Sequence, residues 1–190
     1  MLNKIKNKLE KNGIGEFEIA LKINTELDES NTGLDSLPTI IKIDIVKYSG
    51  VELEKETKIG EYECVLIPGF SPEDKYNDLA FIADSYSPDT FRAVKGFINT
   101  DGTIKYDFLN PNIIYIKRVY LQPEYRNKGI GSYSFYLLYT LLKNLAGILT
   151  IYPYPNNKEN EKPLLNFLNK FNFLEKGNGI WYIDTRYTLF

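Results

Sequence analysis

The residues best suited to chemistry lie in one short turn. Arg126, Gly129 and Gly131 form the pattern Arg-x-x-Gly-x-Gly, with Lys128 inside it. A β-branched apolar run at 113–121 precedes this turn, and a helical pattern of apolar residues follows it directly. Glycines let backbone N–H groups approach an anion closely, and the N-terminus of the following helix adds the positive end of its dipole. The stretch 112–138 therefore predicts an anion-binding site.

The glycine spacing separates this turn from two nucleotide-binding loops. A P-loop needs the pattern Gly-x-x-x-x-Gly-Lys-Ser/Thr, whereas only Ile130 lies between Gly129 and Gly131. A dinucleotide-binding turn needs a third glycine where Ser134 stands, and an acidic residue after the next strand. Both features are missing, so neither loop explains the pattern.

Residues 119–132, read V-Y-L-Q-P-E-Y-R-N-K-G-I-G-S, resemble the acetyl-CoA motif of the GNAT acyltransferase superfamily. The resemblance extends over about 112–184. It implies acetyl-CoA as co-substrate and no metal, with two parallel strands at 113–121 and 148–152 that splay apart, often beside a bulge. It also implies that the pantetheine arm pairs with the backbone of the first strand and that the turn binds pyrophosphate. The implied cofactor-binding residues are Val119, Tyr120, Leu121, Arg126, Asn127, Lys128, Gly129, Ile130, Gly131 and Ser132.

The catalytic groups of the family are matched less well. Some members carry a glutamate base on the main strand, and counting back from Arg126 places Tyr115 there as the candidate catalytic residue. The tyrosine acid of many members would stand at Leu168, so this acid is absent. Tyr152 and Tyr154, near the end of the second parallel strand, are further candidates. Each of these tyrosines also fits a packed position on a sheet.

Composition removes several classes of site. Histidine is absent and Cys64 is the only cysteine, which excludes histidine-dependent nucleophilic sites, mixed Cys/His zinc sites and an internal disulfide. Cys64 shares a predicted strand face with Tyr62 and Leu66, so we expect it to fill the core. The net charge of −2 gives no reason to expect nucleic-acid binding. No apolar run approaches the roughly 18 residues of a membrane helix, so a cytoplasmic location without membrane contact is expected.

Hydrophobic periodicity predicts strands separated by a few helices. Strands are expected at 17–23, 39–48, 58–67, 113–121, 148–152, 173–175 and 180–183, a further hairpin around Asp101-Gly102, and helices at 88–95, 129–145 and 163–171. Strand, helix and strand over 113–152 form a βαβ unit with parallel strands. With the resemblance, this predicts an α+β fold of α/β/α type: a mixed, mostly antiparallel sheet of about six or seven strands, flanked by helices, around a central parallel pair. We expect one domain over 1–190, with an N-terminal appendage at 1–38 and an acyl-CoA-binding core at 112–184.

Residues 1–12 carry Leu2, Ile5 and Leu9 at helical spacing among four lysines. A basic amphipathic anchor for a membrane or a partner would show this pattern. We instead expect a short terminal helix that frays, because an isolated helix of this length is marginal in water.

Two functions follow from the sequence. The first is an N-acyltransferase that moves an acetyl group from acetyl-CoA to the amine of a small molecule or protein. The second is a GNAT-like module that binds acyl-CoA without turnover, as a sensor or interaction partner. The intact phosphate turn favours the first function, and the missing tyrosine favours the second. The sequence identifies neither the acceptor nor the oligomeric state, and a homodimer stays open.

Overall fold

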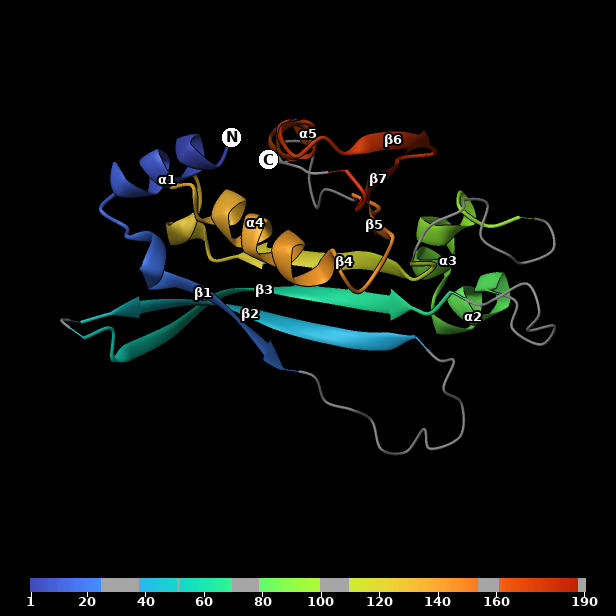
Figure 1. Cartoon of the computed structure of the whole chain (residues 1–190), viewed down its shortest axis with the longest axis horizontal. Coiled ribbons are helices and arrows are strands. Elements are labelled where there is room, and N and C mark those ends of the chain that lie inside the picture. Colours follow the sequence, from blue (N-terminus) through green and yellow to red (C-terminus); the bar gives the residue numbers. More distant parts are fainter. Residues whose placement is uncertain (25–37, 51, 70–78, 100–109, 154–160, 188–190) are drawn as a thin grey trace.

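The computed structural model describes residues 1–24, 38–50, 52–69, 79–99, 110–153 and 161–187. The expected turn at Asp101-Gly102 and candidate Tyr154 lie outside these residues. Within them, seven strands form one sheet (Figure 1). The strands are β1 (Ile19–Asn24), β2 (Thr39–Ser49), β3 (Lys55–Ile67), β4 (Ile113–Leu121), β5 (Ile148–Ile151), β6 (Leu174–Gly177) and β7 (Ile180–Asp184). The helices are α1 (Leu2–Glu10), α2 (Leu79–Tyr86), α3 (Pro88–Lys95), α4 (Ile130–Leu142) and α5 (Glu161–Lys170), with single 3-10 turns η1 (Glu16–Glu18) and η3 (Pro123–Tyr125).

The sheet has the order β1-β2-β3-β4-β5-β7-β6. Its neighbouring strands are antiparallel except β4 and β5, which are parallel and joined through α4. This arrangement confirms the predicted α+β class, the seven-strand sheet and the central βαβ unit. The division of the chain into a core and an appendage stays a prediction.

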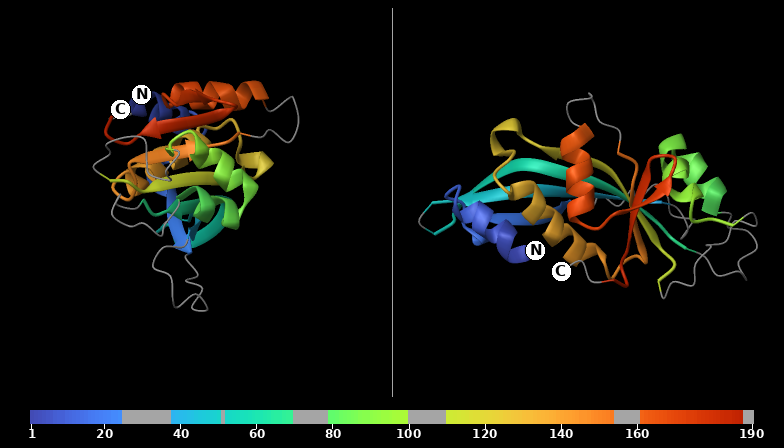
Figure 2. Two further views of the ribbon diagram at one scale, coloured as in Figure 1. Left: turned by 90° about the vertical axis from the view of Figure 1, so that its right-hand side faces the viewer. Right: turned by 90° about the horizontal axis from the view of Figure 1, so that it is seen from above.

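Successive side chains of a strand point to opposite faces of the sheet, so the sheet contributes to two apolar cores, one on each face. Tyr62, Cys64, Ile114 and Ile116 enter the first core, which α1, α4 and α5 cover (Figure 2). Val65, Ile67, Ile113 and Tyr115 enter the second core, which α2 and α3 cover. The prediction that Cys64 fills core is confirmed, because this thiol is fully buried. The α4 layer therefore lies on the face of β4 opposite to Tyr115.

The expectation of a fraying N-terminal helix is wrong. Ile5 and Leu9 of α1 are each 1% exposed and belong to the first core. Figure 1 shows α1 beside α4, and the two helices are in contact. Packing of the apolar face supplies the stability that a short isolated helix lacks. The apolar face of α1 is therefore occupied by the protein's own core.

The region between β3 and β4 is helical where the structure describes it. The apolar run that begins at Leu79, which the sequence leaves without an assignment, forms α2. The next helix, α3, is confirmed at its predicted position and has a side-chain cap: the Ser87 hydroxyl accepts a hydrogen bond of 3.1 Å from the Thr90 N–H, and Pro88 is the first helical residue. No helix among the described residues is long and apolar enough to cross a membrane.

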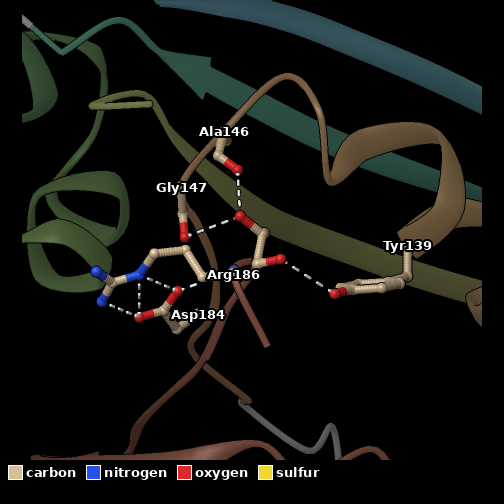
Figure 3. A network of polar contacts seen from close by, with 6 residues as sticks. Tyr139, Ala146, Gly147, Asp184 and Arg186 are labelled. Atoms are coloured by element: carbon tan, nitrogen blue, oxygen red, sulfur yellow. Dashed lines mark hydrogen bonds and ion pairs between the residues drawn. The ribbon is translucent and has the colours of Figure 1, made fainter. Parts of the chain in front are cut away.

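A polar network fastens the end of β7 to the connection between α4 and β5 (Figure 3). The Thr185 hydroxyl donates to the carbonyl oxygens of Ala146 at 2.8 Å and Gly147 at 3.2 Å. The Tyr139 hydroxyl, on α4, donates to the Tyr187 carbonyl at 2.9 Å. These bonds hold β5 against β7, and this pairing leaves the far end of β4 without β5 beside it.

Candidate acyl-CoA site

β4 and β5 are paired only where they begin. The pairs are Ile113 with Ile148, Ile114 with Leu149 and Tyr115 with Thr150. Beyond Tyr115, β4 continues to Leu121 along β3, while β5 ends at Ile151 and stays paired with β7. Among the described residues, one edge of β4 therefore has no strand paired with it from the fork at Tyr115 to the turn that follows Leu121, and we call this the open edge.

A β-bulge lies directly beyond the fork. Glu63 pairs with Arg118 and Cys64 pairs with Ile116, so Lys117 is an extra residue on β4. The Lys117 ammonium donates to the Glu63 carboxylate at 2.7 Å. A bulge bends its strand and increases the local twist. Consistently, β4 is buried up to Ile116, exposed from Lys117 to Tyr120 and half-buried at Leu121.

The open edge presents backbone groups of alternate residues. The Gln122 N–H donates to the Ile59 carbonyl on β3 at 2.9 Å. Because backbone groups of successive strand residues point to opposite edges, those of Val119 and Leu121 point away from β3. The Arg126 side chain confirms this direction for Leu121, since its Nε donates to the Leu121 carbonyl at 2.8 Å. An extended ligand with amide groups can pair along this edge like an additional strand.

The turn between β4 and α4 aims N–H groups at a point beside that edge. Asn127 and Gly129 adopt left-handed φ angles of 63° and 93°, which glycine and asparagine tolerate best. Gly129 is the N-cap of α4 and has no side chain that could cap the helix. The N–H groups of the first helical turn are therefore available to an external acceptor, and the helix dipole favours an anion there.

Gly131 leaves space in front of these N–H groups. A Cβ atom built on Gly131 would meet only the Leu121 Cδ2, at 3.9 Å. Packing between the described residues therefore does not require glycine at this position. A close approach by a ligand to the first turn would require it.

A buried contact holds the first turn of α4 on the sheet. The hydroxyl oxygens of Ser134 and Tyr62 lie 2.8 Å apart, and the Ser134 hydroxyl also lies 3.2 Å from the Gly131 carbonyl. Ser134 is fully buried, as is Tyr62 at 1% exposure. The N-terminus of α4 thus has a fixed position relative to β3 and β4.

The structure brings the implied cofactor-binding residues together around the end of β4. Val119 is 47% exposed, and Tyr120 has the guanidinium carbons of Arg118 and Arg126 each 5.9 Å from its ring centroid. Lys128 lies over the Tyr125 ring at 5.9 Å. Three cations, Arg118, Arg126 and Lys128, therefore lie against aromatic rings at the end of β4 and in the turn.

Tyr115 lies apart from the turn, at the fork. Its side chain is 3% exposed and packs in the second core, on the face that α2 and α3 cover. Burial raises the pKa of Tyr115 to about 12, with smaller effects from Asp89, Tyr152 and Glu63. This hydroxyl stays protonated at neutral pH, so it can donate a hydrogen bond but cannot act as a tyrosinate base.

Two positions at α5 were also considered from the sequence, Leu168 within the helix and Asn172 after it. Leu168, where the resemblance implies the family's tyrosine acid, is an apolar side chain fully buried in the first core. Asn172 has a φ of 55° and so provides a left-handed residue just after α5, which asparagine tolerates well. Among the described residues, no group of three or more His, Cys, Asp or Glu side chains is placed to hold a metal ion.

A cavity of about 490 Å³ lies between α5 and the β6–β7 hairpin. Its lining combines apolar side chains with two polar ones and comprises Pro153, Leu164, Leu165, Asn169, Glu175, Gly179 and Trp181. Glu175 and Trp181 are direct partners across the β6–β7 pair. Phe167 and Phe171, by contrast, turn toward Phe135 of α4. The cavity therefore lies on the side of α5 away from the phosphate turn.

Two lysines that sequence reasoning missed also reach the turn. Lys8 comes from α1 and Lys170 from the end of α5, where its ammonium donates to the Ser132 hydroxyl at 2.8 Å. No local pattern could identify them, because each is far from the turn along the chain. The helical spacing in residues 1–12 was the only available signal, and it did not indicate where α1 would pack.

Comparison with known proteins shows the family of this chain. The model of the acetyltransferase (GNAT) family matches residues 69–173, which is more than half of the chain. Among solved structures, a crystal structure of a point mutant of KacT aligns at 10% sequence identity and a TM-score of 0.45, covering 89% of this chain and 96% of that chain. A search of curated proteins finds no match. On the strength of the family match, this chain belongs to the acetyltransferase (GNAT) family.

Proposed function

We propose that the protein is an N-acyltransferase that moves an acetyl group from acetyl-CoA to the amine of a small molecule or protein. The observation that carries this proposal is the open edge of β4, which runs from the fork at Tyr115 to the phosphate turn. Pantetheine amides pair with the backbone of Val119 and Leu121 along this edge. The Leu121 carbonyl has two lone pairs, so it can accept from a pantetheine N–H and from Arg126 together.

The turn and its cations bind the pyrophosphate. The N–H groups at the start of α4 donate to phosphate oxygens, and Arg126 and Lys128 supply positive charge. Asn127 and Gly129 keep the turn in its left-handed conformation. The absence of a Cβ at Gly131 lets the phosphates come close to Ile130 and Ser132.

Transfer takes place where the pantetheine arm ends, near the fork. The neutral amine attacks the thioester carbonyl, and a backbone N–H of the open edge stabilises the resulting oxyanion. The C–S bond then breaks and releases CoA thiolate, while the amine proton leaves to water. Tyr115 is the candidate catalytic residue of this proposal: its protonated hydroxyl is buried at the fork, and it would donate a hydrogen bond to the thiolate if the acyl end of the ligand enters that face of β4. Positioning of the two reactants supplies most of the acceleration in such a mechanism.

A cytoplasmic location, with neither a nucleic-acid nor a membrane partner, is part of this proposal. Cys64 is a buried thiol with no cysteine to pair with, which suits a reducing compartment. The alternative function is a module that binds acyl-CoA without turnover. Leu168 favours this alternative, because it leaves the site without the family's acid.

Thermal unfolding with CoA and acetyl-CoA, followed by a thiol-release assay, tests the proposal. A ligand at 100 times its Kd stabilises the folded state by about 2.7 kcal/mol, which is a measurable rise in Tm. Acetyl-CoA should raise Tm and release thiol with at least one member of a panel of amines and peptides. Stabilisation without thiol release against a broad panel would support the binding module. No stabilisation by either ligand would contradict both functions.

A further inference from the structure

Four cations converge on the phosphate turn from three separate segments. Arg126 and Lys128 belong to the turn itself. Lys8 lies over it, since a Cβ atom on Gly129 would be 3.4 Å from the Cβ and Cγ of Lys8. Lys170 reaches the first turn of α4 through its bond to Ser132. α1 and α5 therefore add two ammonium groups to a site that already has positive charge.

Within the part of the chain that the structure describes, no carboxylate forms an ion pair with these four cations, Arg126, Lys128, Lys170 and Lys8. On the same helix, Lys6 pairs with Glu16. Burial, and then the positive charge of Lys8, lower the pKa of Lys170. The two lysines thus repel each other in the absence of an anion, and a bound anion would relieve that repulsion.

We infer that Lys8 and Lys170 form a second phosphate subsite, which binds the 3′-phosphate of coenzyme A; this inference rests on the proposed function. The pyrophosphate occupies the N–H groups of the turn, and the pantetheine arm leaves it along β4. The nucleoside must then leave toward the other side, where the helices α1 and α5 meet the start of α4. Lys8 and Lys170 are the cations that those two helices bring to the turn.

The charges of ligand and site agree. A phosphate monoester carries about −1.5 to −2 at pH 7, so two ammonium groups match the 3′-phosphate. Arg126 and Lys128 then match the pyrophosphate. A charge-assisted hydrogen bond is about twice as strong as a neutral one. The consequence is donor specificity: the protein should prefer CoA thioesters over thioesters of dephospho-CoA, which lacks only the 3′-phosphate.

Calorimetric titration of the full chain with CoA and with dephospho-CoA, at one fixed salt concentration, tests this inference. Wild type should bind CoA at least about tenfold more tightly than dephospho-CoA. Lys8→Gln and Lys170→Gln should each weaken CoA binding by about fivefold or more and leave dephospho-CoA binding unchanged. Dephospho-CoA thus reports in the same experiment that each variant is folded.

Lys143→Gln is the matched control. It removes one positive charge from the opposite end of α4, about 20 Å from the turn by helix rise. This variant should bind both ligands as wild type does. A similar loss of CoA affinity in this variant would mean that net charge alone is responsible, and would overturn the inference.

The outcomes separate the inference from the proposed function. If wild type binds both ligands equally, the 3′-phosphate subsite is wrong and the acyl-CoA site stands. If Lys8→Gln or Lys170→Gln weakens both ligands by the same factor, that lysine does not act on the 3′-phosphate, and the inference is again wrong. If wild type binds neither ligand, the proposed function itself fails.

Discussion

Replacing Gly131 with glutamate should make the folded protein more stable and at the same time prevent it from binding CoA. Position 131 is in the first turn of α4, and a Cβ there meets only the Leu121 Cδ2 at 3.9 Å. Glycine within a helix costs about 0.5–1 kcal/mol relative to alanine. A carboxylate in the first turn gains about 0.3–1 kcal/mol from the helix dipole. The free energy of unfolding of Gly131→Glu should therefore rise by about 1 kcal/mol, and Tm by about 2–4 °C.

Ligand binding should change in the opposite direction. The new side chain would fill the space that the pyrophosphate needs, and its negative charge would repel the phosphates. The stabilisation of about 2.7 kcal/mol that CoA gives at 100 times its wild-type Kd should be lost almost entirely. Gly131→Gln is the matched control, because it has nearly the same shape without the charge. It should bind CoA better than Gly131→Glu and less well than wild type.

The assay is thermal unfolding of wild type and both variants, with and without CoA. Gly129→Ala provides the contrast, because a φ of 93° at that position makes a Cβ costly by about 1–2 kcal/mol even without ligand. The reasoning is refuted if Gly131→Glu keeps the full stabilisation by CoA, since the phosphates would then bind elsewhere. A large loss of stability in ligand-free Gly131→Glu would contradict the finding that a side chain at position 131 has room beside Leu121.

Three further predictions concern the cores. Leu9→Ala should lower the free energy of unfolding, measured in urea, by about 2–5 kcal/mol, because Leu9 is 1% exposed; a cost near zero would mean that α1 frays after all. Burial raises the pKa of Cys64 to about 12, so a chromogenic disulfide should react with this thiol only after denaturant is added, and rapid labelling of the folded protein would contradict the burial. Because the folded pKa of Tyr115 is about 12, above its ordinary value of 10.0, the stabilising contribution of the neutral hydroxyl is complete below pH 10 and is lost between pH 10 and 12. Tyr115→Phe should therefore lose less stability than wild type over this range in melts at stepped pH, and identical alkaline profiles would place Tyr115 in contact with water.

The sequence predicted the parts of the site that neighbouring residues decide. The strand at 113–121 was predicted with the bounds that β4 has, because its β-branched run ends at a proline. The positions of Gly129 and Gly131 indicated the turn, and α4 begins directly after it. Short-range sterics and helix capping determine all of these features, so they can be read from adjacent residues.

Other features depend on residues that are distant along the chain. The resemblance implied that the two strands splay apart, often beside a bulge. The position of the fork beyond Tyr115, however, depends on β5 staying paired with β7 while the bulge at Lys117 bends β4. The packing of α1 was wrongly predicted, since its stability comes from the core that α4 completes. The convergence of Lys8 and Lys170 on the turn follows from the same packing.

The sequence by itself therefore determined that this chain has a strand, a glycine turn and a helix of the GNAT type, because backbone conformation and helix capping act over a few residues. The tertiary structure alone decided how long an edge of β4 is open, how the candidate Tyr115 is buried and protonated, and which distant cations reach the turn. Long-range packing sets burial and charge proximity, and these quantities fix pKa values and ligand contacts.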